Sequence, residues 1–225
     1  MNSHSDNGDA AGRPAQAVPP SGFRHLPGLL GEAAQREVLA ATLGVVAEAP
    51  WFAPTMPCSG RPFSVRMTNC GRLGWVSDRA GYRYQATHPD TGLPWPAIPE
   101  PVLAIWRAVA DYPHLLEACL VNLYRGDARM GLHQDRDEED LAAPVVSVSL
   151  GDEVVFRVGG VMARRGPTGS LRLASGDVVV LGGGARLCFH GIDRVLPGTS
   201  ALVPGGGRVN LTLRRVTLPA AEEAP

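Results

Sequence analysis

The chain has 225 residues, a formal net charge of −1 at pH 7 and 44% hydrophobic residues. This length and apolar content suffice for one catalytic domain with a substantial core. The near-neutral charge gives no global indication of a nucleic-acid partner, so any such partner has to be argued from local charge. All 21 basic residues are arginine, which we attribute to a GC-rich genome.

Cysteine spacing and hydropathy exclude several other classes of protein. Cys58, Cys70, Cys119 and Cys188 form no C-x-x-C pair, which argues against a zinc ribbon or a disulfide scaffold and fits a reducing cytoplasm. No apolar run reaches the roughly 18 residues that a membrane span requires, so we expect no membrane partner. Residues 1–20 lack the order of a signal peptide and are expected to form a disordered leader. Nothing in the sequence requires more than a cytoplasmic monomer.

Two helices are expected in the first half of the chain. Residues 29–49 are rich in Ala, Leu and Glu, and Pro50 should end the helix that they form. A second helix is predicted at 99–112, where apolar residues recur at helical spacing. The stretch between the helices is rich in Gly and Pro, with short strand-like pieces at 63–68 and 81–85.

After residue 118 the pattern changes to short β-rich runs separated by Gly, Pro and Asp. These runs lie at 119–124, 145–150, 153–158, 171–173, 177–181, 187–190 and 209–216. Many short strands with turn residues between them are typical of an antiparallel sandwich or barrel. We therefore predict an α+β fold with one domain at 21–217, in which N-terminal helices buttress a jelly-roll core at 118–217. Residues 218–225 are expected to form a tail.

A histidine and an aspartate two residues apart suggest a metal site. In an extended segment His133 and Asp135 point to the same face, while Gln134 points away. A second histidine, His190, ends the strand-like run at 186–190. Two imidazoles and one carboxylate leave open positions on a metal, the arrangement of non-heme Fe(II) oxygenases. The His-x-Asp pattern also occurs by chance, so a metal site needs support from a second group of residues.

The last predicted strand supplies that second group of residues. Its polar residues alternate with apolar ones and share one face; they are Arg208, Asn210, Thr212 and Arg214. Guanidinium groups bind carboxylates in bidentate fashion, although a solvated strand face would show the same alternation. Asn122 and Tyr124 share a face shortly before His133. A dicarboxylate that chelates iron at one end, such as 2-oxoglutarate, would use both sets of side chains.

Short motifs containing these residues follow one another between Phe63 and Arg215. They are Met-Thr-Asn-Cys-Gly at 67–71, Leu-Gly-Trp at 73–75, Gly-Tyr-x-Tyr at 81–84, Asn-Leu-Tyr at 122–124, Leu-His-Gln-Asp-Arg-Asp-Glu at 132–138, Ala-Pro-Val-Val-Ser-Val-Ser-Leu-Gly at 143–151, Gly-Asp-Val-Val-Val at 176–180, Phe-His-Gly-Ile at 189–192 and Arg-x-Asn-Leu-Thr-x-Arg at 208–214. With this set the chain resembles the AlkB family of Fe(II)- and 2-oxoglutarate-dependent dioxygenases, closest to its bacterial repair enzymes. The resemblance implies a double-stranded β-helix (jelly roll) with a base-recognition lid at 58–97.

The resemblance also implies a role for each matching residue. Iron would be held by His133, Asp135 and His190. The co-substrate 2-oxoglutarate would be held by Arg208, Asn210 and Arg214, with Asn122 and Tyr124. The base pocket or the bound strand would be contacted by Met67, Trp75 and Tyr82, and the damaged base would be faced by Asp137 and Glu138. The implied reaction consumes O₂ and 2-oxoglutarate, removes an N-methyl group as formaldehyde, and yields succinate and CO₂.

Local charge in the predicted lid favours nucleic acid. Residues 58–87 contain a single acid, Asp78, against Arg61, Arg66, Arg72, Arg79 and Arg83, with Trp75, Tyr82 and Tyr84 interleaved. Such a mixture suits a phosphate backbone and an unstacked base, although aromatic residues that pack a lid onto the core would look the same. Asp137 and Glu138 would favour positively charged bases such as N1-methyladenine and N3-methylcytosine, whereas Glu139 and Asp140 are expected to face water. The expected partner is alkylated DNA, preferentially single-stranded, with RNA as a second candidate.

One position departs from the family pattern, and two alternatives stay open. The bacterial repair enzymes carry a pocket arginine at a place that is Ala163 here, with Arg164 and Arg165 just beyond. Either one of these arginines reaches in from a shifted loop or the contact is absent. The first alternative function is a dioxygenase that acts on RNA modifications, a protein side chain or a small metabolite. The second is a metal-free jelly-roll binding module.

Overall fold

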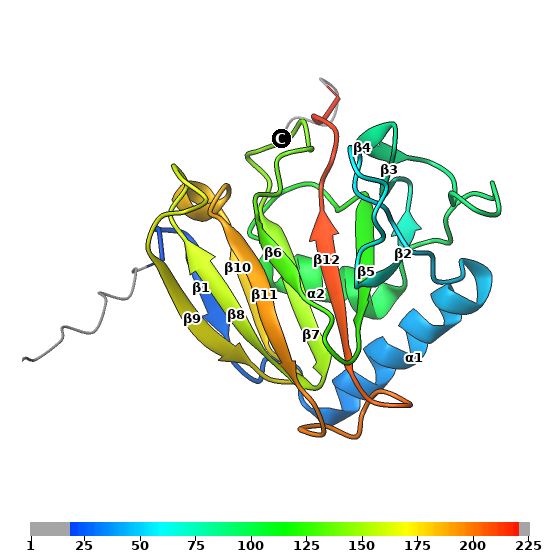
Figure 1. The fold of residues 1–225 in the computed structure, drawn as a ribbon. Coiled ribbons are helices and arrows are strands. Elements are labelled where there is room, and N and C mark those ends of the chain that lie inside the picture. The colour runs from blue at the N-terminus through cyan, green and yellow to red at the C-terminus, as the bar shows by residue number, and fades with distance from the viewer. Residues whose placement is uncertain (1–18, 221–225) are drawn as a thin grey trace, which may run out of the picture.

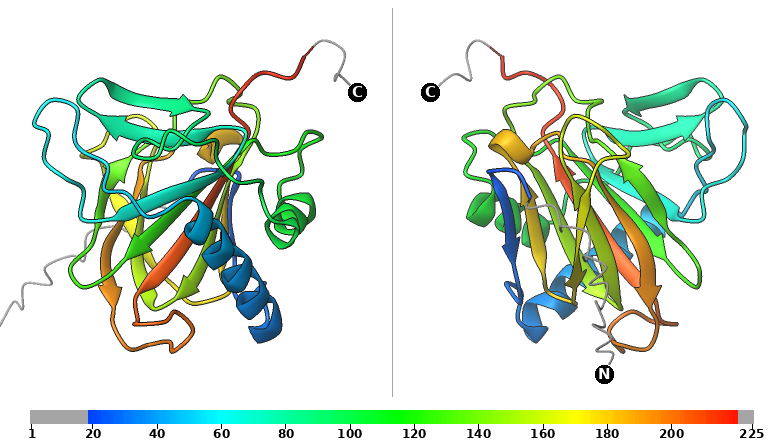
Figure 2. Two further views of the ribbon diagram at one scale, coloured as in Figure 1. Left: turned by 90° about the vertical axis from the view of Figure 1, so that its right-hand side faces the viewer. Right: turned by 60° about the vertical axis from the view of Figure 1, so that its left-hand side comes forward.

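The computed structural model describes residues 19–220. Most of the predicted leader, residues 1–18, and part of the predicted tail, residues 221–225, lie outside the described residues. Two antiparallel sheets face each other, with a separate hairpin beside one end of them and two helices on the outside (Figures 1 and 2). Among the described residues, no helix is long and apolar enough to cross a membrane.

The six-stranded sheet, called the major sheet below, has the strand order β1-β10-β7-β12-β5-β2. Its strands are β1 (Phe23–Leu26), β10 (Val178–Leu181), β7 (Val145–Gly151), β12 (Arg208–Arg214), β5 (Ala118–Tyr124) and β2 (Arg66–Gly71). The four-stranded minor sheet has the order β6-β11-β8-β9, formed by β6 (Met130–His133), β11 (His190–Leu196), β8 (Glu153–Gly159) and β9 (Thr168–Leu173). The hairpin pairs β3 (Gly74–Asp78) with β4 (Gly81–Gln85).

The core has two halves, one on each side of the major sheet. Apolar residues of α1 (Glu32–Glu48) and α2 (Glu100–Val109) pack on one face of the sheet, against strand residues such as Val121, Val148 and Leu211. The other face meets the minor sheet, where Tyr124 and Val179 belong to one cluster with Phe156. The α+β jelly-roll prediction with buttressing helices is therefore confirmed.

Some predicted elements need correction. Three short strands, β1, β3 and β6, were not predicted, and the piece expected at 63–68 is β2 at Arg66–Gly71. The expected strand at 187–190 is wrong: a 3-10 turn at Gly183–Ala185 precedes it, and His190 begins β11 rather than ending a strand. The glycines at 182–184 favour this turn over extended structure, because glycine readily adopts the positive φ of 50° found at Gly183.

Candidate active site

The polar face of β12 lines a pocket between the two sheets. β12 lies between β7 and β5 in the middle of the major sheet. Its apolar residues join the helix-side core, whereas its polar residues face the pocket; these are Arg208, Asn210, Thr212 and Arg214. The structure therefore has the predicted alternation of polar and apolar side chains along β12.

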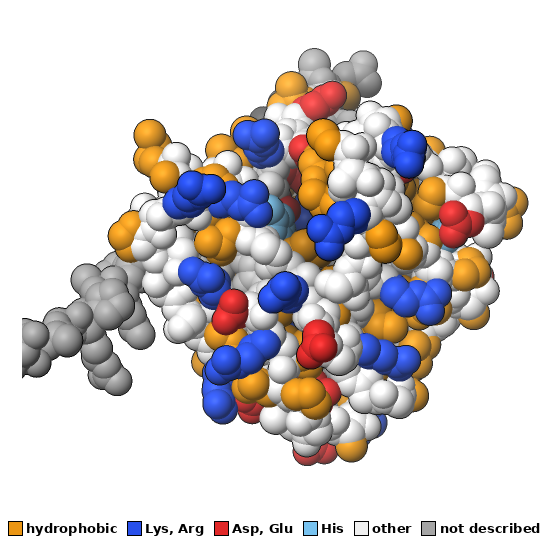
Figure 3. Space-filling view, in the orientation of Figure 1, with side chains coloured by type: hydrophobic (Ala, Val, Ile, Leu, Met, Phe, Trp, Pro, Cys, Tyr) orange, Lys and Arg blue, Asp and Glu red, His pale blue; other side chains and the backbone are white. Residues whose placement is uncertain are grey.

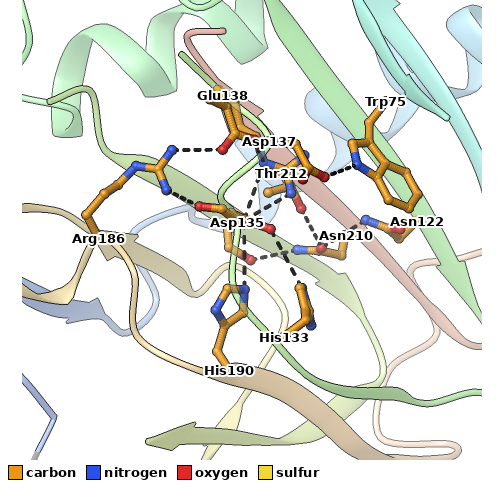
Figure 4. A network of polar contacts seen from close by, with 12 residues as sticks. Trp75, Asn122, His133, Asp135, Asp137, Glu138, Arg186, His190, Asn210 and Thr212 are labelled. Carbon is orange, nitrogen blue, oxygen red and sulfur yellow. Dashed lines mark hydrogen bonds and ion pairs between the residues drawn. The ribbon is translucent and has the colours of Figure 1, made fainter. Parts of the chain in front are cut away.

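Two histidines and one aspartate converge at the mouth of this pocket (Figure 4). His133 ends β6 and His190 begins β11, and the two residues are direct partners across these strands. Asp135 follows β6 and lies with one carboxylate oxygen 3.7 Å from Nε2 of His133 and the other 3.8 Å from Nε2 of His190. The potential ligand atoms of the three residues lie within 4.8 Å of one another.

His133, Asp135 and His190, called the triad below, have surroundings that favour metal binding. Hydrogen bonds and burial fix the protonation of the two histidines. Nδ1 of His133 is 2.9 Å from the carbonyl oxygen of Gly131, and Nδ1 of His190 is 3.1 Å from that of Cys188. Carbonyl oxygens only accept hydrogen bonds, so each Nδ1 donates and each Nε2 keeps its lone pair for a metal. Burial, followed by the nearby His133 ring, lowers the pKa of His190 to about 4, which keeps this ligand neutral.

Asp135 is held as a carboxylate despite its burial. Burial alone would raise its pKa, but Arg214 and the two histidines lower the pKa below the ordinary value. Nη2 of Arg214 lies 3.0 Å from the carboxylate. Two neutral imidazoles and an ionised carboxylate form the donor set expected of a non-heme Fe(II) centre, so the residues present fit this metal.

Deeper in the pocket, Arg208 is buried with only part of its hydrogen-bonding capacity used. Its side chain is 1% exposed, and Nη2 donates to Oγ of Ser149 at 2.9 Å, while Nε and Nη1 have no partner. The guanidinium also lies over the ring of Tyr124, 5.3 Å from its centroid. Burial lowers the pKa of Arg208 to about 10, which still leaves it charged near neutrality. A buried cation with unused donors is costly, so this arrangement fits an anionic ligand.

The other predicted co-substrate residues surround the same space. Asn210 is fixed by its amide donating to Ser147 and to the backbone of Val148, both at 2.8 Å. Its carbonyl oxygen accepts from Thr212 at 3.1 Å and from Asn122 at 3.4 Å. Oδ1 of Asn122 and Nη1 of Arg214 are buried without partners, as two Arg208 nitrogens are. The open guanidinium nitrogens are the donors that a dicarboxylate such as 2-oxoglutarate would accept from.

A buried ionic network behind the metal site was not predicted from the sequence (Figure 4). Arg186 is 4% exposed and donates to the backbone oxygens of Asp135 at 2.6 Å and Ala143 at 2.7 Å. Its third contact, at 3.0 Å, is with the carboxylate of Glu138. Glu138 also accepts from the Tyr84 hydroxyl and lies 3.3 Å from Arg214. Arg186 thus holds the backbone at the carboxylate ligand itself.

Replacing Arg186 with methionine should therefore lower both stability and metal affinity. The change removes the donor to one oxygen of the buried Glu138 carboxylate and to the carbonyl oxygens of Asp135 and Ala143, which should cost about 3 kcal/mol in free energy of unfolding. Loss of an outer contact to a ligand typically weakens metal binding by about 10- to 100-fold. Urea unfolding and titration with Mn(II) measure the two effects. An Arg186→Met protein with wild-type Mn(II) affinity would contradict the positioning role.

The aromatic lid residues contact one another and the segment that follows His133 and Asp135. Trp75 on β3 stacks on Tyr82 of β4, with ring centroids 5.5 Å apart and planes 20° apart. The ring of Phe63 meets Trp75 edge-on at 6.4 Å. Nε1 of Trp75 donates to Asp137 at 3.0 Å, which links the hairpin to the segment that follows the metal ligands. These contacts bring Trp75, Tyr82 and Asp137 together.

Several expected roles change once the contacts are known. Met67 is 1% exposed and packs in the core, and Glu138 is enclosed by the network described above, so their expected contacts with the base stay predictions. The expectation that Asp140 faces water is wrong, because Asp140 is buried and accepts from Tyr112 at 2.5 Å. In the lid, Arg83 is paired with Asp78 at 2.8 Å, and Arg72 is paired with Glu117. Because their charges are already paired, these two arginines are less available to bind a phosphate.

The loop that follows β8 brings an arginine close to the site. A Cβ atom built on Gly131 would lie 3.4 Å from Nη2 of Arg164, so this guanidinium rests against β6 two residues before His133. Gln134 ties the same loop to the metal segment through a 3.0 Å hydrogen bond to the carbonyl oxygen of Val161. Of the two arginines beyond Ala163, Arg164 is therefore the one that reaches towards the site.

The fold and the donor set define a class of enzyme, and comparison with known families agrees. The family model described as the 2OG-Fe(II) oxygenase superfamily matches residues 22–214. Its members combine a jelly-roll fold with an Fe(II) centre, 2-oxoglutarate and O₂, which are the cofactor and co-substrates of this chain.

Similar proteins narrow the class. An alpha-ketoglutarate-dependent dioxygenase AlkB homolog of Caulobacter vibrioides is 57% identical over 203 residues, covering 90% of each chain. The AlkB dioxygenase of Escherichia coli K12 is 43% identical over 175 residues, covering 76% of this chain and 80% of the relative. The solved structure of OsALKBH1 superposes with a TM-score of 0.73 at 30% identity, covering 89% of this chain and 99% of that one. The chain therefore belongs to the AlkB family of Fe(II)/2-oxoglutarate-dependent dioxygenases.

Proposed function

We propose that the protein repairs alkylated nucleic-acid bases, such as N1-methyladenine and N3-methylcytosine, by oxidative demethylation. The observation that carries this proposal is the 3.0 Å hydrogen bond that Nε1 of Trp75 donates to Asp137, two residues after Asp135 of the triad (Figure 4). An aromatic surface for an unstacked base and a carboxylate that favours a cationic one suit these lesions. The names of the AlkB relatives support the same substrate class.

We assign the following roles to the residues of this chain. His133, Asp135 and His190 hold Fe(II), while Arg208, Arg214, Asn122, Asn210 and Tyr124 hold 2-oxoglutarate. When bound, the iron, 2-oxoglutarate and O₂ supply the oxidation that hydroxylates the N-methyl group, with succinate and CO₂ as co-products. The hydroxymethyl product loses formaldehyde and leaves the repaired base. The sheets around Arg208 exclude water from the co-substrate, and Trp75 with Tyr82 positions the base.

The direct test is a mass-spectrometric assay on a short single-stranded oligonucleotide with one N1-methyladenine. Fe(II), ascorbate and 2-oxoglutarate are supplied, and a reaction without 2-oxoglutarate serves as the control. We expect loss of the methyl group with matching formaldehyde and succinate. Succinate without demethylation would indicate a different substrate, and no turnover by iron-loaded protein would overturn the proposal.

Replacing Trp75 with alanine should separate base binding from the oxidative chemistry. The change removes the stacking surface, worth roughly 1–3 kcal/mol per base, so demethylation of oligonucleotides should fall about 10- to 100-fold. The triad and Arg208 are left in place, so substrate-free decarboxylation of 2-oxoglutarate should persist. If Trp75→Ala keeps both activities at the wild-type level, the lid assignment is wrong.

We also propose a preference among nucleic-acid substrates. We favour single-stranded DNA, because a base already free of pairing enters the site without the free energy of unpairing. RNA is the second candidate, and paired assays on DNA and RNA strands of one sequence discriminate between them.

We further propose a monomer that works in the cytoplasm. The triad and the co-substrate pocket are built from one chain, and all four cysteines are free thiols. Size-exclusion chromatography with light scattering tests the oligomeric state.

A further inference from the structure

The outer face of the minor sheet is lined with arginines. Along β8, residues 154, 156 and 158 are buried, whereas Glu153, Val155 and Arg157 are only partly buried and point outward. Arg172 on β9 and Arg194 on β11 both pair with Val155 in register, so the two arginines flank β8 on this outer face. Arg157 lies one row nearer to the metal site, opposite Gly191, the residue after His190. We call Arg157, Arg172 and Arg194 the arginine face.

The spacing of these arginines suits a nucleic-acid backbone. Strands in a sheet lie about 4.8 Å apart and successive rows about 6.6 Å apart, so neighbouring guanidinium stems stand roughly 8–10 Å from each other. A strand of stacked nucleic acid carries one phosphate per roughly 3.4 Å of rise, so this face spans on the order of three phosphates. Because the chain has no lysine, its cationic surface consists of arginines, which bind phosphates in bidentate fashion.

The arginine face is connected to the active site by the loop between β8 and β9. Arg164 and Arg165 on this loop are exposed, and Arg164 rests against β6 beside the metal ligands. The same loop holds Met162, whose side chain is 91% exposed and available to stack on an unpaired base. Figure 3 shows basic side chains spread over this side of the molecule, next to the hollow that contains histidine. The cationic surface therefore continues from the pocket mouth to the outer sheet face.

Little of this charge is neutralised. Across the four strands of the minor sheet the only acids are Glu153 and Asp193. Arg172 lies 3.5 Å from Glu153, but 71% of the arginine side chain is exposed, so the pair is a weak surface contact. Within residues 19–220, no acidic side chain lies within ion-pair distance of Arg164, Arg165 or Arg194.

We propose that the arginine face binds the sugar-phosphate backbone of the strand that carries the target base, on the flank away from the Trp75 hairpin. Arg157 lies nearer the site, and Arg172 and Arg194 flank β8 in the next row, so a single flexible backbone that leaves the pocket can cross all three. This inference rests on the proposed nucleic-acid function and extends it: one flank of the strand lies on the lid, and the other lies across the minor sheet. Substrates long enough to reach Arg172 and Arg194 should therefore bind more tightly than short ones.

The test compares single strands of about 3 and about 15 nucleotides, each with one N1-methyladenine, using wild-type protein and the double variant Arg172→Gln/Arg194→Gln. For the long strand we expect KM to rise roughly tenfold at moderate salt. The slope of log affinity against log salt should fall by about 1.4, since each lost contact removes about 0.7. The kcat for both strands, and the KM for the short strand, should stay at wild-type values.

The control of equal charge is Arg36→Gln/Arg107→Gln, which removes two positive charges from α1 and α2, where each arginine is paired with a glutamate as Arg172 is. This control should leave KM and the salt slope for the long strand unchanged. The proposal is overturned if the double variant on the minor sheet behaves as wild type, or if the short strand loses affinity equally. The long strand is also assayed as a duplex, and loss of affinity for the duplex alone would overturn the proposal by assigning the face to the complementary strand. Wild-type turnover of the short strand reports separately on the proposed function.

Discussion

Replacing Asp135 with alanine should abolish demethylation and substrate-free decarboxylation together. Among residues 19–220, Asp135 supplies the only carboxylate within ion-pair distance of both His133 and His190, and its removal leaves Arg214 facing the vacated space. Loss of an outer contact typically costs about 10- to 100-fold in activity, so loss of the ligand should cost at least about 1000-fold. Removing one partner of a buried ion pair should also lower the free energy of unfolding by about 3–5 kcal/mol.

The control for this experiment is Arg136→Ala, which alters the exposed neighbour of Asp135 and leaves all three ligands in place. Mn(II) titration, succinate release and urea unfolding should be measured on both variants. Asp135→Ala protein that is folded and still binds Mn(II) with wild-type affinity would show that the metal lies elsewhere. The Arg136→Ala variant should match wild type in metal affinity and in succinate release without nucleic acid.

Replacing Arg208 with lysine should raise the KM for 2-oxoglutarate by about 100-fold with little change in metal affinity. Lysine keeps the positive charge but lacks the planar guanidinium whose Nε and Nη1 are free to bind a carboxylate. Loss of one or two charge-assisted hydrogen bonds at roughly 1.5–3 kcal/mol each accounts for a change of this size. Succinate release at varied 2-oxoglutarate concentration measures the KM, and calorimetric titration of 2-oxoglutarate into Mn(II)-loaded protein should show a parallel rise in Kd.

A second variant distinguishes ligand binding from repacking of the pocket. Ser149→Ala removes only the hydroxyl that accepts from Nη2 of Arg208 and leaves the guanidinium in place. Its KM for 2-oxoglutarate should rise no more than about tenfold, because one neutral partner of the arginine is lost. Equal defects in Arg208→Lys and Ser149→Ala would show that pocket geometry, and not the guanidinium, determines the affinity.

The sequence predicted those parts of the site that depend on local periodicity. Alternation along 208–214 placed Arg208 and Arg214 on one face because strand geometry repeats every two residues. The spacing of His133 and Asp135 likewise placed both near one metal, although β6 ends at His133 and Asp135 lies just beyond it. The jelly-roll architecture followed from a succession of short β-rich runs.

The parts that failed depend on contacts between distant segments. Arg186 carries no local signal, and its role comes from partners at 135, 138 and 143 that only the fold brings together. Glu138 and Asp140 belong to an acidic run typical of a solvated turn, yet Arg186 and Tyr112 draw them into the interior. Strand β1 is a four-residue segment defined by pairing with β10, more than 150 residues away, which no local pattern reveals.

The buried central strand β12 and the hairpin of β3 and β4 should differ in how easily they open and in how well they tolerate substitutions. β12 is hydrogen-bonded on both edges, and all seven of its residues are buried, so its amides should exchange with solvent only when the whole domain opens. The hairpin of β3 and β4 pairs only with itself and should open locally at much lower free energy. Over evolutionary time, substitutions in this hairpin can therefore shift the range of accepted bases while the oxidation chemistry stays intact.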